Sequence, residues 1–102
     1  MKQRDSSALK SNAAQMAHKL KVMSHPERLL MLCRLDDGEV SVSGLTELSG
    51  LSQSSVSQHL AMLREEDVVA IRSEAQTRWY RLKDPAVSAI IHALCEICDT
   101  QN

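Results

Sequence analysis

One glycine between two short amphipathic segments restricts the fold of this chain more than any other feature. The first segment, Val42–Ser49, carries leucines three positions apart, and Gly50 follows where a left-handed residue would end a helix. The second segment, residues 51–66, has Ser52 as a favourable N-cap and apolar residues at i, i+4 and i+7. A helix, a glycine-containing turn and a second helix form the helix-turn-helix arrangement, whose second helix reads the major groove of DNA.

The outward face of residues 51–66 is polar, and most of its side chains are small. Such side chains hydrogen-bond to base edges or phosphates without blocking entry into the groove. We therefore expect DNA contacts from five residues of this face: Gln53, Ser54, Ser57, Gln58 and Arg64. The pattern leaves one alternative open, an ordinary solvated amphipathic helix that binds nothing.

Two β-rich segments follow the second helix. They comprise residues 68–74 and 78–83, and Ala75, Gln76 and Thr77 separate them. We interpret the pair as a β-hairpin, the wing of a winged helix-turn-helix.

Helices are predicted before and after this unit. Residues 7–23 form a helical run with an apolar stripe. Ser24 and Glu27 then form a capping box with Pro26 in the first turn, which starts a helix that runs to about residue 35.

The last helix is expected to begin with Asp84 as its cap and Pro85 at its first position. Its apolar positions are Val87, Ile90, Ile91, Leu94, Ile97 and Cys98. This stripe is wider than a small domain can cover by itself. We therefore predict a homodimer built from the first and last helices, with the two reading helices about 34 Å apart, one turn of DNA.

The predicted fold is mainly α with a small β-hairpin, and the 102 residues form a single domain with disordered termini at about 1–7 and 99–102. There is no run of 18 apolar residues and no apolar stretch of the signal-peptide type at the start, so we expect a cytoplasmic protein. In that compartment its three cysteines would begin as thiols.

The charge of the chain argues against a protein that simply coats nucleic acid, since the formal net charge is −1. Residues 53–83 hold five Arg and Lys side chains against four acidic ones, which is a weak electrostatic footprint for a DNA binder. A dimer doubles the number of phosphate contacts, so this count does not exclude DNA binding.

Three strings, MSHPERLLMLCRL, LSQSSVSQHLAMLREEDVV and AQTRWYRL, resemble the ArsR family of bacterial winged-helix repressors, and the likeness covers nearly the whole chain. The resemblance implies a homodimer on an imperfect inverted repeat of double-stranded DNA, which an inducer releases. It implies base contacts from Gln53, Ser54, Ser57 and Gln58, and backbone or minor-groove contacts from Arg64, Thr77 and Arg78. For His59, at the edge of the buried face, a structural hydrogen bond and a DNA contact both remain open.

Neither metal site of the family is preserved. Ser41 and Ser43 stand where many relatives have Cys-Val-Cys, and hydroxyls do not replace thiolates as ligands of soft or borderline metals. At the site on the last helix Asp84 is present, but the other ligand positions hold Ala86, Ile97 and Thr100. We therefore expect no metal and no cofactor at these positions.

Cys33 and Cys98 resemble the dithiol branch of the family, the BigR and SqrR type repressors that respond to persulfides and other reactive sulfur species. The resemblance implies that an inducer closes a disulfide or polysulfide bridge between Cys33 and Cys98, and that DNA affinity then falls. The alternative is that both cysteines are inert and pack as small hydrophobic side chains.

Cys95 departs from the two-cysteine pattern. It forms C-E-I-C with Cys98 and a His-x2-Cys-x2-Cys run with His92, so a metal-responsive or haem-responsive site around these three residues is a further alternative. A catalytic C-x-x-C pair would sit at a helix N-terminus in a βαβ unit, whereas this one closes a C-terminal helix. We therefore do not expect an enzyme, although an enzyme or scaffold with no DNA role remains the third hypothesis.

Overall fold

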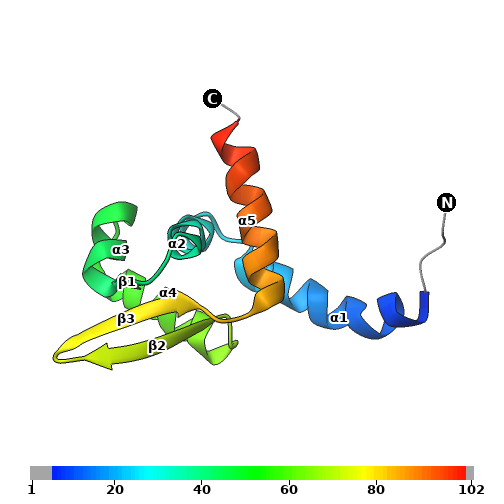
Figure 1. The fold of residues 1–102 in the computed structure, drawn as a ribbon, viewed down its shortest axis with the longest axis horizontal. Helices are drawn as coiled ribbons and strands as arrows, with labels where there is room; N and C mark the ends of the chain where they lie inside the picture. The colour runs from blue at the N-terminus through cyan, green and yellow to red at the C-terminus, as the bar shows by residue number, and fades with distance from the viewer. Residues whose placement is uncertain (1–5, 101–102) are drawn as a thin grey trace.

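The computed structural model describes residues 6–100, and the order of its elements is that of a winged helix-turn-helix (Figure 1). The elements are α1 (Ser6–Met23), α2 (Pro26–Asp36), β1 (Val40–Ser41), α3 (Val42–Ser49), α4 (Gln53–Glu65), β2 (Val69–Glu74), β3 (Thr77–Leu82) and α5 (Pro85–Asp99). The predicted fold class is thereby confirmed.

Three helix ends form as local sequence predicts. Gly50 has a φ of 72°, in the left-handed region, and its N–H donates to the carbonyl of Thr46 to end α3. Ser52 Oγ accepts the N–H of Ser55 at 3.1 Å and caps α4. Asp84 accepts the N–H groups of the second and third residues of α5 and caps that helix.

The start of α2 differs from the predicted capping box. The N-cap is His25, not Ser24, and its Nδ1 accepts the N–H of Glu27 at 3.2 Å. Pro26 occupies the first turn as expected, because its missing N–H needs no partner there.

The wing is an antiparallel hairpin in which Val69 pairs with Leu82 and Glu74 pairs with Thr77. Only two residues connect its strands. Thr77, which the sequence placed in the connection, is instead the first residue of β3. The first of the two, Ala75, has a φ of 54°, a conformation that hairpin turns usually reserve for glycine, asparagine or aspartate. β1 adds a third strand against β3, giving the order β1-β3-β2. Two residues are too few to show a strand pattern in the sequence.

The hydrophobic core lies where α2, α3, α4 and α5 meet the sheet. Its most buried members come from all of these elements and include Met31, Leu32, Leu45, Val56, Leu60, Leu63, Val68, Val69, Val87 and Ile91. α2 packs against both α3 and α5 and so links the helix-turn-helix to the C-terminal helix.

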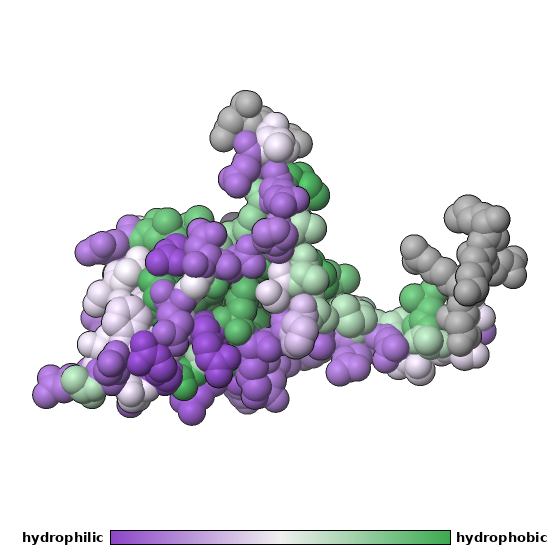
Figure 2. Space-filling model, in the orientation of Figure 1, coloured by the Kyte–Doolittle hydropathy of each residue, from purple (hydrophilic) through white to green (hydrophobic). Residues whose placement is uncertain are grey.

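Outside this core, apolar side chains of α1 and α5 are exposed. Figure 1 shows α1 and the hairpin extending in opposite directions, with α5 rising between them. Leu9 and Leu20 of α1 are 60% and 50% exposed, and Ile97 of α5 is 54% exposed. In Figure 2, hydrophobic surface is visible toward the outer end of α1 and along α5.

Both terminal helices reach into segments that the sequence predicted to be disordered. Ser6 and Ser7 belong to α1, and Asp99 ends α5, whereas residues 1–5, 101 and 102 lie outside the described part. None of the helices described combines the length and the apolar character needed to cross a membrane.

Ion pairs join α1 to the rest of the domain. Lys19 Nζ lies 2.7 Å from Asp84 Oδ2 at the start of α5, and this hydrogen bond lowers the pKa of Asp84. His18 Nε2 lies 2.6 Å from the carboxylate of Glu66, directly after α4. α1 is therefore held at its C-terminal half, and its N-terminal half projects.

Candidate DNA-binding surface and dithiol site

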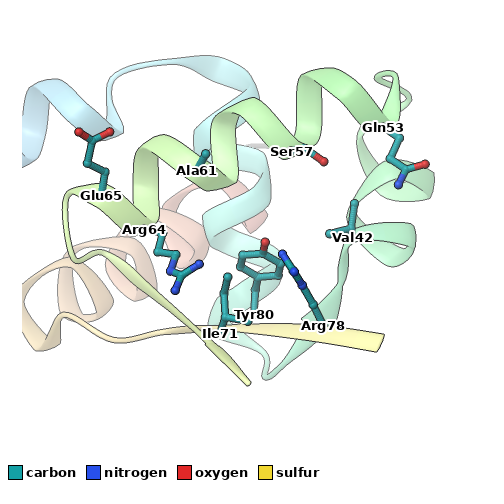
Figure 3. Close-up of a pocket in the computed structure, with 9 residues that line it drawn as sticks. All are labelled: Val42, Gln53, Ser57, Ala61, Arg64, Glu65, Ile71, Arg78 and Tyr80. Atoms are coloured by element: carbon teal, nitrogen blue, oxygen red, sulfur yellow. The ribbon is translucent and has the colours of Figure 1, made fainter. Parts of the chain in front are cut away.

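A groove separates the polar face of α4 from the hairpin (Figure 3). Its volume is about 600 Å³, and α4 contributes Gln53, Ser57 and Arg64 to its wall. Arg64 extends from α4 toward the hairpin, and Arg78 extends from β3 toward α4. The structure thus brings four of the residues predicted to contact DNA to one groove.

The other predicted DNA contacts lie around this groove. Thr77 lines a neighbouring hollow together with Gln53, Arg78 and Gln76. Ser54 and Gln58 are exposed on α4 but do not line either hollow. Gln76, which the sequence placed in the connection and to which it gave no role, also lines this hollow.

Three arginines of α4 and the hairpin differ in their partners. Arg72 contacts the carboxylates of Glu39 and Glu74 at 3.0 and 3.1 Å, and these hydrogen bonds, Glu39 first, raise the pKa of Arg72. Within residues 6–100, neither Arg64 nor Arg78 forms a salt bridge. The charges of Arg64 and Arg78 are therefore available to phosphates, whereas that of Arg72 is compensated within the protein.

His59 does not face the groove. Its side chain is 17% exposed, and its Nε2 lies 3.2 Å from the carboxylate of Glu27 in the first turn of α2. Its ring also lies 4.9 Å from the ring of His25. Of the two roles that the sequence left open, the geometry favours the structural hydrogen bond over a DNA contact.

The cysteines are paired differently from the prediction. The structure joins Cys33 of α2 to Cys95 of α5 in a disulfide, with a Cα–Cα distance of 6.0 Å, and leaves Cys98 free and exposed. The expected partner of Cys33 was Cys98. All three cysteines nevertheless line one cavity of about 360 Å³ between the two helices.

The packing of α2 against α5 explains this pairing. His92 Nδ1 lies 2.9 Å from Asp36 Oδ2, and three residues further along α5 Cys95 meets Cys33, three residues earlier on α2. The two helices are therefore antiparallel in a register that places Cys98, another turn along, opposite Leu30, which lines the same cavity. This register depends on how the two helices pack, so the spacing of the cysteines in the sequence does not predict it.

The alternative ligand set His92, Cys95 and Cys98 is not assembled in the described part of the chain. His92 engages Asp36 and Glu96, and the hydrogen bond to Asp36 is the main cause that raises the pKa of His92. Cys95 is bonded to Cys33. The only group of metal-ligating side chains brought together among residues 6–100 is a different one, His25, Glu27 and His59.

Comparison with known proteins finds one family. Residues 25–70, from the cap of α2 to the start of the wing, match the family described as "Bacterial regulatory protein, arsR family". The chain is 46% identical over 87 residues to the HTH-type transcriptional regulator YgaV of Escherichia coli K12, which covers 84% of this chain and 88% of that protein. It is 44% identical over 86 residues to the transcriptional activator HlyU of Vibrio cholerae, which covers 84% of this chain and 80% of that protein.

A solved structure shows the same fold. The transcriptional repressor BigR of Xylella fastidiosa superposes with a TM-score of 0.84 at 34% identity, over 92% of this chain and 96% of that chain. HlyU is an activator and BigR a repressor, and all three of these relatives are regulators of transcription.

Proposed function

Because this chain belongs to the arsR family of bacterial regulatory proteins, we propose that it is a homodimeric repressor that leaves its operator when a sulfur bridge joins α2 to α5. As a member of that family it is a DNA-binding regulator of transcription and not an enzyme. The cysteines between α2 and α5 are the observation that carries the proposed switch.

The DNA-binding part of the proposal rests on the groove beside α4. The polar residues Gln53 and Ser57 line it from the reading helix, and the uncompensated charges of Arg64 and Arg78 lie on its two sides. Amide and hydroxyl groups suit base edges, and guanidinium groups suit phosphates and the minor groove. Ser54 and Gln58 are assigned to the bases with them, and Thr77 to the DNA backbone.

The dimer is supported by the exposed apolar side chains of the terminal helices. Leu9 and Leu20 of α1 and Ile97 of α5 are each at least half exposed in the single chain. A two-fold interface over these helices would bury them and set the distance between the two reading helices. The operator would then be an inverted repeat with half-sites about one helical turn apart.

The proposed inducer is a reactive sulfur species of the persulfide class. A cysteine thiolate attacks the outer sulfur of a persulfide R–S–SH, forms Cys–S–SH and releases R–S⁻. A second thiolate then attacks the inner sulfur, closes the disulfide and releases HS⁻, so that two thiols are oxidised and one sulfur is reduced to sulfide. If the second cysteine is itself persulfidated, the same attack leaves one additional sulfur in the bridge.

The geometry favours Cys33 and Cys95 as the first pair to be bridged, in place of Cys33 and Cys98. Their Cα distance of 6.0 Å lies within the usual disulfide range of about 4.4–6.8 Å, so a direct bond needs no backbone movement. Cys98 borders the same cavity and supplies a second thiol on α5.

The bridge would act on DNA binding through α2. This helix contacts both α3, the first helix of the helix-turn-helix, and α5, which we assign to the dimer interface. Fixing α2 to α5 would change the spacing or mobility of the two reading helices. A coupling of about 1–3 kcal/mol, typical of allosteric proteins, lowers affinity roughly 5-fold to 150-fold.

Mass spectrometry of the intact, reduced protein after treatment with a persulfide tests the switch. We expect a bridged product, either the plain disulfide or one heavier by whole sulfur atoms, and peptide mapping should place Cys33 in it. Cys33→Ser should abolish the bridge and the loss of DNA binding together. A Cys33→Ser protein that still leaves DNA on persulfide treatment would contradict the proposal.

One observation favours a second candidate, a family regulator with inert cysteines. Cys33 and Cys95 are partly buried and pack against the hydrophobic core, as small hydrophobic side chains do. In that case the wild type and the Cys33→Ser protein would bind DNA equally before and after persulfide treatment.

A further inference from the structure

We propose that His25, Glu27 and His59 form a binding site for a divalent transition-metal cation of the Zn²⁺ class, on the side of α4 that faces away from the groove. One ligand atom from each of the three side chains lies within 4.8 Å of the others. His25 caps α2 and Glu27 lies in its first turn, whereas His59 lies in the middle of α4. The site therefore joins two helices that are separated by more than thirty residues in the sequence.

Two of the three spacings between the ligand atoms are close to those around a tetrahedral ion. The carboxylate oxygen Oε2 of Glu27 lies 3.2 Å from Nε2 of His59 and 3.6 Å from Nε2 of His25. A tetrahedral Zn²⁺ with ligands at about 2.0–2.2 Å separates those ligands from one another by about 3.3–3.6 Å. Both distances to the shared carboxylate are close to this range, so small side-chain rotations would place an ion among the three.

The chemistry of the ligands selects the class of cation. Two imidazole nitrogens and one carboxylate oxygen suit Zn²⁺, Co²⁺ and Ni²⁺, whereas Mg²⁺ and Ca²⁺ are bound through oxygen. Three protein ligands leave a fourth position for water. The side chains of His25 and Glu27 are 37% and 42% exposed and that of His59 is 17% exposed, so an ion can enter from solvent and still meet a half-buried ligand.

Binding would exchange one hydrogen bond for the metal bond. Nδ1 of His25 accepts the N–H of Glu27, so the neutral ring carries its proton on Nε2. When Nε2 binds the cation, this proton moves to Nδ1, which can then no longer accept the N–H of Glu27, so the cap hydrogen bond is lost. In return, the ion links the first turn of α2 to the reading helix, and the charge of Glu27 is compensated.

The site is separate from the cysteines and independent of the proposed sulfur switch. The cavity of the three cysteines includes Pro26 and Leu29 but none of the three ligands. The proposed metal site also differs from the two metal sites of the family, at Ser41 and Ser43 and on α5, where the sequence lacks the ligands. Nothing in the spacing of residues 25, 27 and 59 indicates it, because their proximity depends on how α4 packs on α2.

Titration of the full-length, disulfide-bonded protein with Co²⁺ and then Zn²⁺ tests the proposal. We expect one ion per subunit, a visible absorption band of tetrahedral Co²⁺, and loss of that band when Zn²⁺ displaces it. Glu27→Gln preserves side-chain size and should weaken binding at least about tenfold, since changes even in residues behind metal ligands cost 10- to 100-fold. His59→Gln should do the same.

His92→Gln is the matched control, because His92 also lies beside two carboxylates, Asp36 and Glu96, but outside the site. It should bind Co²⁺ as the parent does. Circular dichroism confirms that each variant is folded. Three results would each overturn the proposal: no saturable binding, undiminished binding by folded Glu27→Gln, or a thiolate-to-cobalt charge-transfer band, which would assign the ion to cysteine.

Discussion

Reducing the bond between Cys33 and Cys95 should lower the free energy of unfolding by about 4 kcal/mol. The two residues are 62 positions apart, so the bond closes more than half of the chain into a loop. For a loop of this length, the bond lowers the entropy of the unfolded chain by about 14 cal/mol/K, which corresponds to about 4 kcal/mol at 25 °C. In a domain of this size each kcal/mol corresponds to about 4–8 °C, so the unfolding midpoint should fall by about 15–30 °C.

Thermal and urea unfolding of the oxidised and reduced protein, followed by circular dichroism, measure this difference. Cys98→Ser is the matched control, because it removes a thiol from the same cavity but leaves the pair intact, and it should retain the full effect of reduction. Cys95→Ser should behave like the reduced protein under oxidising conditions. If oxidation stabilises Cys95→Ser as much as the parent, the pairing of Cys33 with Cys95 derived from the helix register is wrong.

Three further predictions concern DNA reading, pH and packing. Gln58→Ala should weaken a cognate site by about 1–3 kcal/mol and spare random DNA, whereas Arg78→Ala should weaken both; equal effects on the two DNAs would refute the assignment of base contacts. Because its pKa is raised mainly by Asp36, His92 should stabilise the fold at pH values below its unfolded pKa and lose this effect as pH rises through the folded pKa. Asp36→Asn should weaken that pH dependence in urea titrations, since Glu96 also raises the pKa of His92, and an unchanged pH profile would count against the pair. Gly44→Ala should cost about 1–3 kcal/mol in urea unfolding, since its new methyl would lie 2.6 Å from a buried valine methyl on β1; an unchanged midpoint would show that β1 can shift.

The elements that could be predicted are those whose ends are determined locally. Gly50, Ser52 and Asp84 each act on backbone groups within a few residues, and each acts in the structure as the sequence predicts. The apolar stripe of α4 likewise indicates which face is buried, and therefore which residues are exposed toward DNA.

The features that could not be predicted depend on how distant elements pack. β1 exists because Val40 pairs with Tyr80 across the sheet. Cys95 is bonded, and Cys98 is not, because of the register between α2 and α5. The N-cap of α2 is His25 and not Ser24, because His25 accepts a hydrogen bond from its own helix. Nothing in this local pattern indicates that His25 lies close to His59.

The central step of the proposed switch is that a sulfur bridge from Cys33 to α5 weakens DNA binding. Fluorescence anisotropy measures this directly, on a duplex selected from a random pool with the reduced protein, before persulfide treatment, after it, and after re-reduction. We expect that affinity falls roughly fivefold or more on treatment, returns with reductant, and does not change in Cys33→Ser. Equal affinity of the reduced and bridged wild-type protein would contradict the proposed switch.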